Sequence, residues 1–391
     1  MRAVYLGFAV ATLVALATIA ASWQGSGVRA GAPEGSDLPS TVFLTAACCA
    51  FAVYLIGLFI VRRRRTNVAI VCAVAAAIQL VPLAGPLVIS RDVYAYWAYG
   101  RLAAVHHVNP YIVPPGQFAN DPAANAMAGD WRFTQSVYGP VFSAASAGLA
   151  ATSGKSPKAA ALSYRIAGAV GMLAVTALAA SVAPLPGFAA AFVGWNPLLA
   201  VSFAGGGHND IWMMVFVLGA LGLAARRPRA AGVSFALAGG LKWVAFGLLP
   251  LKLLSANRRQ ALLMTTGFLV TTGLVAGIAF FFFGTAWLTT LGTFASRRSD
   301  WAIPSRLEQF GLPRWLALVP LALMAPLLVR SARAGRPRMG LASILLLVAT
   351  PWLLPWYAAW AVPLAAVEED RLAWVLALAF SAYILPDGVP L

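Results

Sequence analysis

An acidic residue, Asp92, opens a polar stretch between two long apolar runs, and its position suits proton-transfer chemistry. The stretch covers residues 90–140 and begins SRDVYAYWAYGR. A carboxylate at the edge of a membrane is costly to place, so a functional role is expected there. Partial desolvation beside aromatic rings would poise Asp92 as a general base. Capping the helix that starts here is the structural alternative, and the two roles are compatible.

Helical spacing puts further polar side chains on the face that carries Asp92. Tyr96 and Tyr99 follow it by about one and two turns, and the pair His106-His107 comes later in the same run. Residues three or four apart share one face of a helix. We therefore expect this face to form the floor of an active site, with Tyr96, Tyr99 and His107 binding substrate and the other histidine meeting water.

A second polar group follows three glycines at residues 205–207. His208, Asn209 and Asp210 stand there in succession, before another apolar run. Three adjacent polar groups suit sugar hydroxyls or proton handling, and a divalent ion is a further possibility. The structural alternative is that Asn209 or Asp210 caps the next helix after a tight glycine turn.

Cations in the second polar loop are candidates for phosphate binding. Arg297, Arg298 and Arg306 are interleaved there with Trp301 and Pro304. Guanidinium groups bind phosphate through two parallel hydrogen bonds, whereas contact with lipid headgroups is the simpler explanation.

Lys242 presents a similar choice, because it follows a diglycine inside an apolar run. Its ammonium would either contact phosphate in a cavity or extend to the inner membrane interface.

Three aromatic residues at the edges of apolar runs complete the candidate set. Tyr138 belongs to a Tyr-Gly-Pro turn, and Trp356 and Tyr357 belong to the segment PWLLPWY. A belt of interfacial aromatics accounts for many such residues in membrane proteins. We expect these three to contact a sugar, Tyr138 above all.

Composition excludes a soluble protein. Hydrophobic residues make up 61% of the chain and charged residues 10%, and the mean hydropathy is +0.79. The formal charge of +16 does not indicate nucleic-acid binding, because the cations stand at the ends of apolar runs. Three cysteines lie inside apolar runs without metal-binding spacing, so neither a disulfide framework nor a metal is expected. No cofactor is expected, and residues 1–21 are interpreted as an uncleaved first helix.

The apolar runs predict an all-α polytopic membrane protein, a single domain over residues 1–391 with about 11–13 transmembrane helices. Two basic segments, Arg62–Arg65 and Arg330–Arg338, mark the cytoplasmic side. Residues 90–140, with short amphipathic helices, and residues 285–312 are then external loops. Residues 141–152 are expected to form a partial helix, and residues 230–254 a broken hairpin that returns to its own side. The resulting net charge is +13 inside and +2 outside.

Several motifs resemble those of the polyprenyl-phosphate-mannose-dependent mannosyltransferases of actinobacterial envelope synthesis. The chain shows RDVYAYWAYGR, NPY, SVYGP, NPLLAVSFAGGGHND, GLK and PWLLPWY in that order. This family has the integral-membrane C-type glycosyltransferase (GT-C) fold, and the motifs cover residues 85–365.

The resemblance implies an inverting transfer of mannose from a polyprenyl phosphate to a hydroxyl of a glycan or glycolipid, on the extracytoplasmic face of the cell membrane. The catalytic acid of the family falls on Asp92, and its GHND motif falls on residues 207–210. Transfer of arabinose from a polyprenyl phosphate is an alternative, since related enzymes use that donor.

Two other classes of membrane protein were weighed. Transporters and lipid flippases also use broken helices and interior charges. No internal repeat is visible here, however, and the polar residues gather toward one side of the membrane. A scaffold without catalysis has no need of an acid in an aromatic loop.

Overall fold

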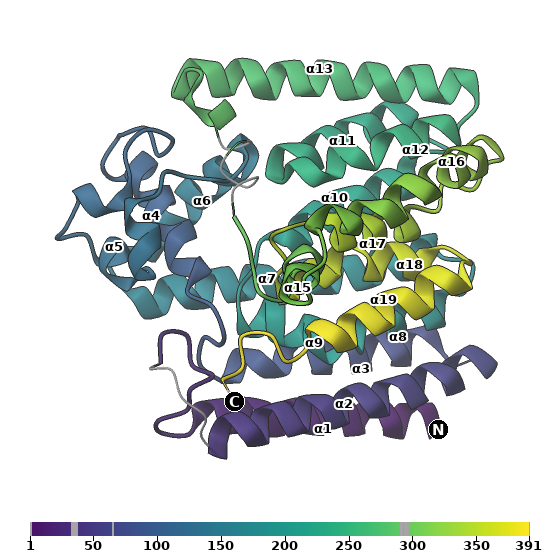
Figure 1. Cartoon of the computed structure of the whole chain (residues 1–391), viewed down its shortest axis with the longest axis horizontal. Coiled ribbons are helices and arrows are strands. Elements are labelled where there is room, and N and C mark those ends of the chain that lie inside the picture. The colour runs from purple at the N-terminus through teal and green to yellow at the C-terminus, as the bar shows by residue number, and fades with distance from the viewer. Residues whose placement is uncertain (1, 33–37, 65, 290–291, 293–296, 391) are drawn as a thin grey trace.

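The computed structural model describes residues 2–32, 38–64, 66–289, 292 and 297–390 (Figure 1). Arg65 and residues 290–291 and 293–296 of the second polar loop, about which predictions were made, lie outside the described residues. The described residues form helices and no β-strand, apart from one isolated bridge between Arg29 and Val88. The predicted all-α polytopic architecture is confirmed.

Among the described residues, five helices are long and apolar enough to span a membrane. They are α1 (Arg2–Ser22), α2 (Leu38–Arg63), α7 (Pro157–Val182), α13 (Arg258–Phe283) and the run Arg314–Arg333, which joins η7 (Arg314–Leu318) to α16 (Val319–Arg333). A sixth candidate consists of α8 (Pro186–Gly194) followed by α9 (Pro197–Ala200) and η4 (Val201–Gly205), with a bend of 54° between the two parts.

Shorter apolar helices complete the membrane part. They are α3 (Val68–Leu80) with η1 (Val81–Ala84), α10 (Asp210–Leu223), η5 (Trp243–Gly247) with α12 (Leu249–Leu254), α17 (Met339–Ala349) and α19 (Arg371–Ile384). Helix α11 (Pro228–Leu241) packs between α10 and α13. The connections contain α15 (Ile303–Gln309), η8 (Pro355–Trp360) and α18 (Val362–Val367).

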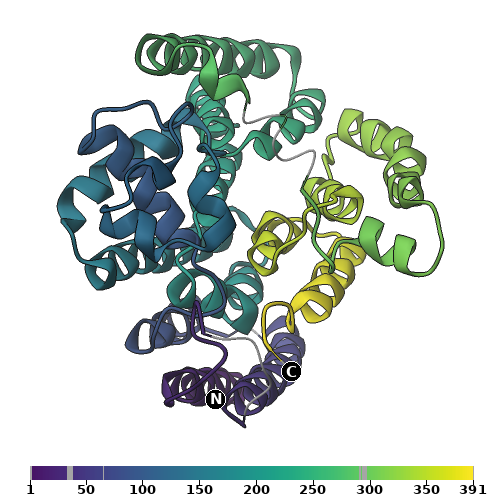
Figure 2. The same ribbon diagram turned by 60° about the vertical axis from the view of Figure 1, so that its left-hand side comes forward.

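The first polar loop folds into a compact helical group. It contains α4 (Asp92–Ala104), η2 (Pro115–Gln117), α5 (Pro122–Ala126) and η3 (Gly129–Phe133), and α6 (Pro140–Ser153) follows it directly. Helix α6, where a partial helix was expected, packs along α4. Figure 1 shows α4–α6 at one end of the long helices, whereas the N-terminus and the α12–α13 connection lie at the other end. Figure 2 shows α1 and α2 (purple) on the opposite side of the molecule from α13 (green).

Local sequence signals fix many helix starts. Proline is the first residue of α6, α7, α8, α9 and α11, where its missing N–H removes no helical hydrogen bond. Polar side chains cap other starts: Asn67, Asn257 and Asp370 accept hydrogen bonds from the first-turn amides of α3, α13 and α19.

Helices α11 and α13 run parallel, as a hairpin that returns to its own side requires. A Cβ at Gly232 would lie against the backbone of Met264, and one at Gly240 against Val275, so both helices advance in the same direction. The chain between them, η5 and α12, therefore runs back along the bundle. The break falls at Lys242, whose extended backbone (φ −151°, ψ 121°) ends α11.

The bend between α8 and α9 is held by buried side chains of other helices. Tyr54 donates a hydrogen bond to the carbonyl of Phe192 (2.6 Å), and the Gln79 amide donates one to Gly194 (2.9 Å). The side-chain oxygen of Asn196 accepts from the first amides of α9. A break inside a membrane frees backbone groups that lipid cannot satisfy, so such partners are required.

We predict that Tyr54→Phe destabilises the protein, because it leaves the buried Phe192 carbonyl without its donor while retaining the ring. The expected loss is about 1–3 kcal/mol of unfolding free energy. The midpoint of denaturant unfolding in detergent measures it. Tyr5→Phe is the matched control, since Tyr5 is 68% exposed on α1. Equal midpoints for both variants would contradict this account of the bend.

Candidate active site

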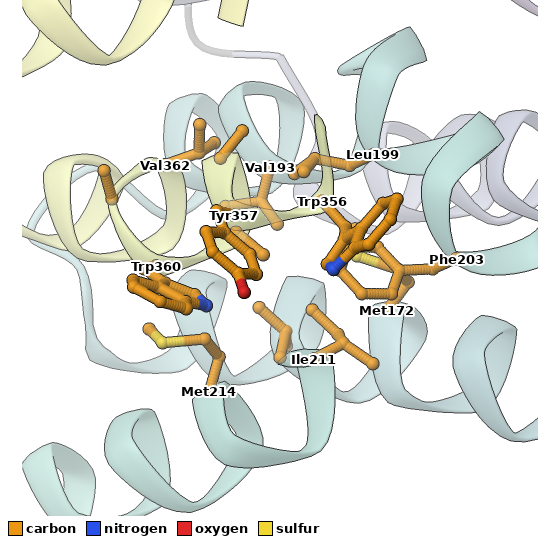
Figure 3. Packing of buried hydrophobic residues seen from close by; sticks show 14 of the residues in the cluster. Met172, Val193, Leu199, Phe203, Ile211, Met214, Trp356, Tyr357, Trp360 and Val362 are labelled. Carbon is orange, nitrogen blue, oxygen red and sulfur yellow. The ribbon is translucent and has the colours of Figure 1, made fainter. Parts of the chain in front are cut away.

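A cavity of about 560 Å³ opens between the α4–α6 group, the start of α10, the end of α11 and η8. Its wall includes the predicted residues Asp92, Tyr96, Tyr138, Asn209, Lys242, Trp356 and Tyr357. Figure 3 shows the aromatic side chains of η8, with Trp356, Tyr357 and Trp360 projecting from that element toward Ile211 and Met214 of α10. The structure thus brings together residues that are up to 265 positions apart in the chain.

Asp92 is the first residue of α4 and does not cap it. Arg91 occupies the N-cap position without a side-chain capping bond, and the Ser90 hydroxyl accepts from the Asp92 amide (3.0 Å). The Asp92 side chain is 29% exposed. Its Oδ2 lies 3.7 Å from Nδ1 of His208. Burial raises the Asp92 pKa to about 6; the Ser90 hydrogen bond and the Lys242 charge oppose this rise, and the Asp210 charge adds to it.

The two tyrosines predicted on the Asp92 face of α4 lie there, in an aromatic cluster. The Tyr96 ring meets those of Tyr138 and Phe142 edge-on, each with centroids 5.1 Å apart. The Tyr96 hydroxyl lies 3.4 Å from Nδ1 of His208. Tyr99 is buried behind Tyr138 and donates to the Thr134 carbonyl (3.0 Å), so it supports the cavity wall.

Neither His106 nor His107 lies on the face of α4 that carries Asp92. Helix α4 ends at Ala104, and the left-handed backbone of His107 (φ 53°) turns its side chain into a separate apolar groove between α6 and α13. His106 instead lies 2.7 Å from Asp121, which Arg101 also binds through two nitrogens. An α-helix rises about 1.5 Å per residue, so even a longer α4 would place either histidine about 20 Å along its axis from Asp92. A substrate-binding role for His107 in this cavity is without geometric support.

The imidazole beside Asp92 is that of His208, and it does not come from α4. It is 1% exposed and stacks on Trp356 with centroids 3.4 Å apart. Burial, and then the Lys242 charge, lower its pKa, so the ring is neutral near pH 7. A neutral ring beside Asp92 leaves that carboxylate without a strong cationic partner, which suits a base.

The glycine turn before His208 is required by close packing. Gly207 has φ +71°, and a Cβ there would lie 2.6 Å from Cγ1 of Val93, the residue after Asp92. A Cβ at Gly206 would lie 2.7 Å from the Ser202 carbonyl oxygen. The turn therefore brings His208 beside the start of α4.

Neither Asn209 nor Asp210 caps α10. Asn209 lines the cavity, and its buried Oδ1 has no hydrogen-bond partner among the described residues. Asp210 is fully buried, and its Oδ1 accepts from Nζ of Lys242 (2.5 Å) and from Nε1 of Trp360 (2.6 Å). Lys242 therefore points into the site and does not extend to the opposite interface.

The three arginines proposed for phosphate binding are not gathered at the cavity. Arg297 stacks on Trp131, at the cavity wall, with 4.4 Å between its Cζ and the ring centroid. Arg298 is exposed and pairs with Glu308 (3.6 Å). Arg306 lies over Trp301 and donates to Gln309. Helix α15 holds the latter two through its own side chains, which spacing in the sequence does not reveal.

Two functional candidates were missed by the sequence reasoning. Arg91 lines the cavity and donates to the Gly31 carbonyl (2.9 Å). Trp360 binds Asp210, and its spacing of four from Trp356 was the available signal. Among the described residues, no group of three or more metal-ligating side chains occurs. The expectation that no metal or cofactor is needed stays a prediction.

These features define a multi-pass membrane protein with a polar cavity at one end of its helices. A family model described as "Alpha-(1->6)-mannopyranosyltransferase, N-terminal domain" matches residues 4–258, more than half of the chain. The chain therefore belongs to this family, and the resemblance to actinobacterial GT-C mannosyltransferases is confirmed.

Two curated relatives carry related names. The chain is 24% identical over 354 residues to "Alpha-(1->6)-mannopyranosyltransferase A" of Mycobacterium tuberculosis, which covers 77% of this chain and 66% of the relative. It is 28% identical over 217 residues to a "Probable alpha-(1->6)-mannopyranosyltransferase" of Mycolicibacterium smegmatis, covering 52% and 36%. The chain thus spans just under two thirds of the first relative and about a third of the second. No solved structure matches it.

We predict that Gly207→Ala destabilises the protein, since it adds a Cβ at positive φ against Val93. The left-handed conformation alone costs roughly 1–2 kcal/mol in a residue other than glycine. Thermal unfolding in detergent measures the change. Gly273→Ala in α13 is the control, because a Cβ there meets nothing within 4 Å. Equal unfolding temperatures for the two variants would count against a close contact between the glycine turn and α4.

Proposed function

We propose that the protein is an inverting glycosyltransferase that moves mannose from a polyprenyl-phosphate donor to a hydroxyl of a glycan or glycolipid. In this proposal Asp92 is the general base, and the cavity faces the extracytoplasmic side of the cell membrane. The observation that carries the proposal is the contrast between two acids at one cavity. Asp92 is partly exposed with a raised pKa, whereas Asp210 is buried and bound to a lysine.

This contrast assigns different roles to the acids. A general base must be free to take a proton, and a pKa near the working pH suits that task. Asp92 meets both conditions. The Asp210 carboxylate is already engaged by an ammonium and an indole N–H, so it is not free to accept the proton of an acceptor hydroxyl.

The reaction then needs a cation where the phosphate departs. The acceptor oxygen attacks the anomeric carbon of mannose as its proton passes to Asp92. The bond between that carbon and the phosphate oxygen breaks, and its electron pair stays on the phosphate. Lys242 and Arg91 line the same cavity as Asp92 and would stabilise this charge. Attack from the side opposite the phosphate inverts the anomeric centre.

A lipid-linked donor also requires an apolar path to the cavity. A second cavity of about 220 Å³ shares Lys242 and Tyr357 with the first and is otherwise lined mainly by aromatic and aliphatic side chains, among them Trp243 and Trp360. An isoprenoid chain attached to a phosphate at Lys242 would extend from the first cavity into this second cavity. The sugar would then lie in the first cavity against Tyr138, Trp356 and Tyr357, with Asn209 Oδ1 accepting from a hydroxyl.

The distribution of basic residues supports the proposed orientation of the cavity in the membrane. The α4–α6 group and the cavity lie at one end of the helices, and the N-terminus and the α12–α13 connection lie at the other. That second end carries Arg2, Arg258 and Arg259. Since basic segments favour the cytoplasmic side, the cavity would face outward.

We predict that Asp92→Asn lowers mannosyl transfer by about 10²–10⁴-fold, because the amide cannot accept the acceptor's proton. Transfer of labelled mannose from a short-chain polyprenyl-phosphate mannose by the purified protein measures the rate. Asp130→Asn is the control, an exposed acid in η3. A rate for Asp92→Asn within threefold of wild type, with the protein folded, would remove Asp92 from its role.

We also predict that kcat/KM rises with pH and levels off above about 6, because the base acts only when ionised and burial raises the Asp92 pKa to about 6. Initial rates between pH 4.5 and 8 at low donor concentration test this. A profile that stays flat through pH 6, or that falls as the pH rises through it, would exclude a base with this pKa.

A further inference from the structure

The Lys242 ammonium stands where the two cavities meet. Its side chain is 16% exposed, and it belongs to the wall of both the polar cavity with Asp92 and the aromatic cavity with Trp243. It comes from the extended break after α11, and a lysine side chain is long and flexible. Other side chains must therefore hold the ammonium in place.

The Asp210 carboxylate holds the Lys242 ammonium from one side, and Trp360 in turn holds the carboxylate. Asp210 Oδ1 accepts a hydrogen bond from Nζ at 2.5 Å and a second one from the Trp360 indole at 2.6 Å. Since the indole binds the same oxygen, it sets the direction of the carboxylate. An ammonium has three N–H donors. Asp210 takes one, and two are left for a ligand in the cavities.

Aromatic faces limit the remaining freedom of Lys242. Nζ lies 4.4 Å from the Tyr357 ring centroid and 5.1 Å from that of Trp360. These two rings stack on each other with centroids 4.2 Å apart. Cations are attracted to aromatic faces at such distances. The carboxylate and the rings together fix the ammonium against one wall.

We propose that Asp210 and Trp360 are positioning residues that present the Lys242 ammonium to the phosphate of a lipid phosphate. The proposal rests on the proposed function and deepens it: Asp210 acts through Lys242 and does not handle the acceptor's proton. Trp360 acts in two ways: its indole N–H donates to the Asp210 carboxylate, and its ring face lies 5.1 Å from Nζ of Lys242. Removal of the indole N–H should then weaken phosphate binding only while Lys242 is present.

The test is a double-mutant cycle read out by the binding of farnesyl phosphate, a short isoprenoid phosphate. Trp360→Phe keeps a ring and loses the N–H, and Lys242→Gln removes the charge. We expect Trp360→Phe to weaken binding about tenfold and Lys242→Gln to weaken it more, about 10²-fold, as for loss of a charge-assisted contact. In the Lys242→Gln background, Trp360→Phe should change binding by less than twofold. Asp210→Asn should behave as Trp360→Phe does.

Trp374→Phe is the matched control. Trp374 is also a buried tryptophan, and its Nε1 donates to the Ala365 carbonyl at 2.6 Å, away from the cavity. It should leave farnesyl phosphate binding unchanged. Equal losses for Trp374→Phe and Trp360→Phe, or independent effects of Trp360→Phe and Lys242→Gln, would overturn the positioning role. So would a wild-type protein that fails to bind farnesyl phosphate.

Mannosyl transfer by the same variants separates this proposal from the proposed function. If the two residues position Lys242, Trp360→Phe should raise the KM for the lipid donor and leave the acceptor KM unchanged. An increase in the acceptor KM instead would contradict the positioning role. If wild-type protein binds farnesyl phosphate and shows the coupling but transfers no mannose, the proposed function fails and the positioning role stands.

Discussion

The ion pair between Lys242 and Asp210 connects three elements at which regular helix stops or starts. The lysine ends α11, the aspartate begins α10, and the tryptophan that shares the carboxylate belongs to η8. Removing two charges from water costs several kcal/mol, and a buried pair is tolerated when its remaining groups are also bonded. Trp360 adds a second hydrogen bond to Oδ1 of Asp210, the oxygen that Lys242 binds, whereas the buried Oδ2 has no hydrogen-bond partner among the described residues. The aromatic faces supply favourable contact with the cation. The cluster holds Lys242 at the wall of the cavity.

A related requirement applies at other helix breaks of this protein. Arg165 of α7 donates to the carbonyls of Gly85 and Ala204, at the ends of η1 and η4. Tyr54 and Gln79 do the same for the bend after α8. Each break frees backbone groups in a region without water, and a side chain from another helix satisfies them. The breaks allow polar loops to approach the cavity, and these partners stabilise them.

The cavity separates two carboxylates by environment. Asp92 is partly exposed beside a neutral imidazole, whereas Asp210 is buried beside an ammonium. A site with this separation suits chemistry that needs a proton acceptor and a fixed cation a short distance apart. The proposed glycosyl transfer from a phosphate would use both groups.

The sequence by itself determined the membrane class, most helix positions and several of the residues at the cavity. Hydropathy, first-turn prolines and capping side chains act over a few residues, so they are readable along the chain. Asp92, Tyr138, Asn209, Lys242 and Trp356 were all predicted, and the broken hairpin at Lys242 followed from the basic residues that flank it.

Only the tertiary structure decided which polar groups meet. It replaced His107 by His208, separated Arg298 and Arg306 from the cavity, and joined Asp210 to Lys242 and Trp360. The packing of the Gly207 turn against Val93 decided the first, and side chains within α15 decided the second. Contacts between residues 32 and 150 positions apart decided the third. Such contacts depend on helix packing, and no local pattern encodes the side of a helix that a distant segment will reach.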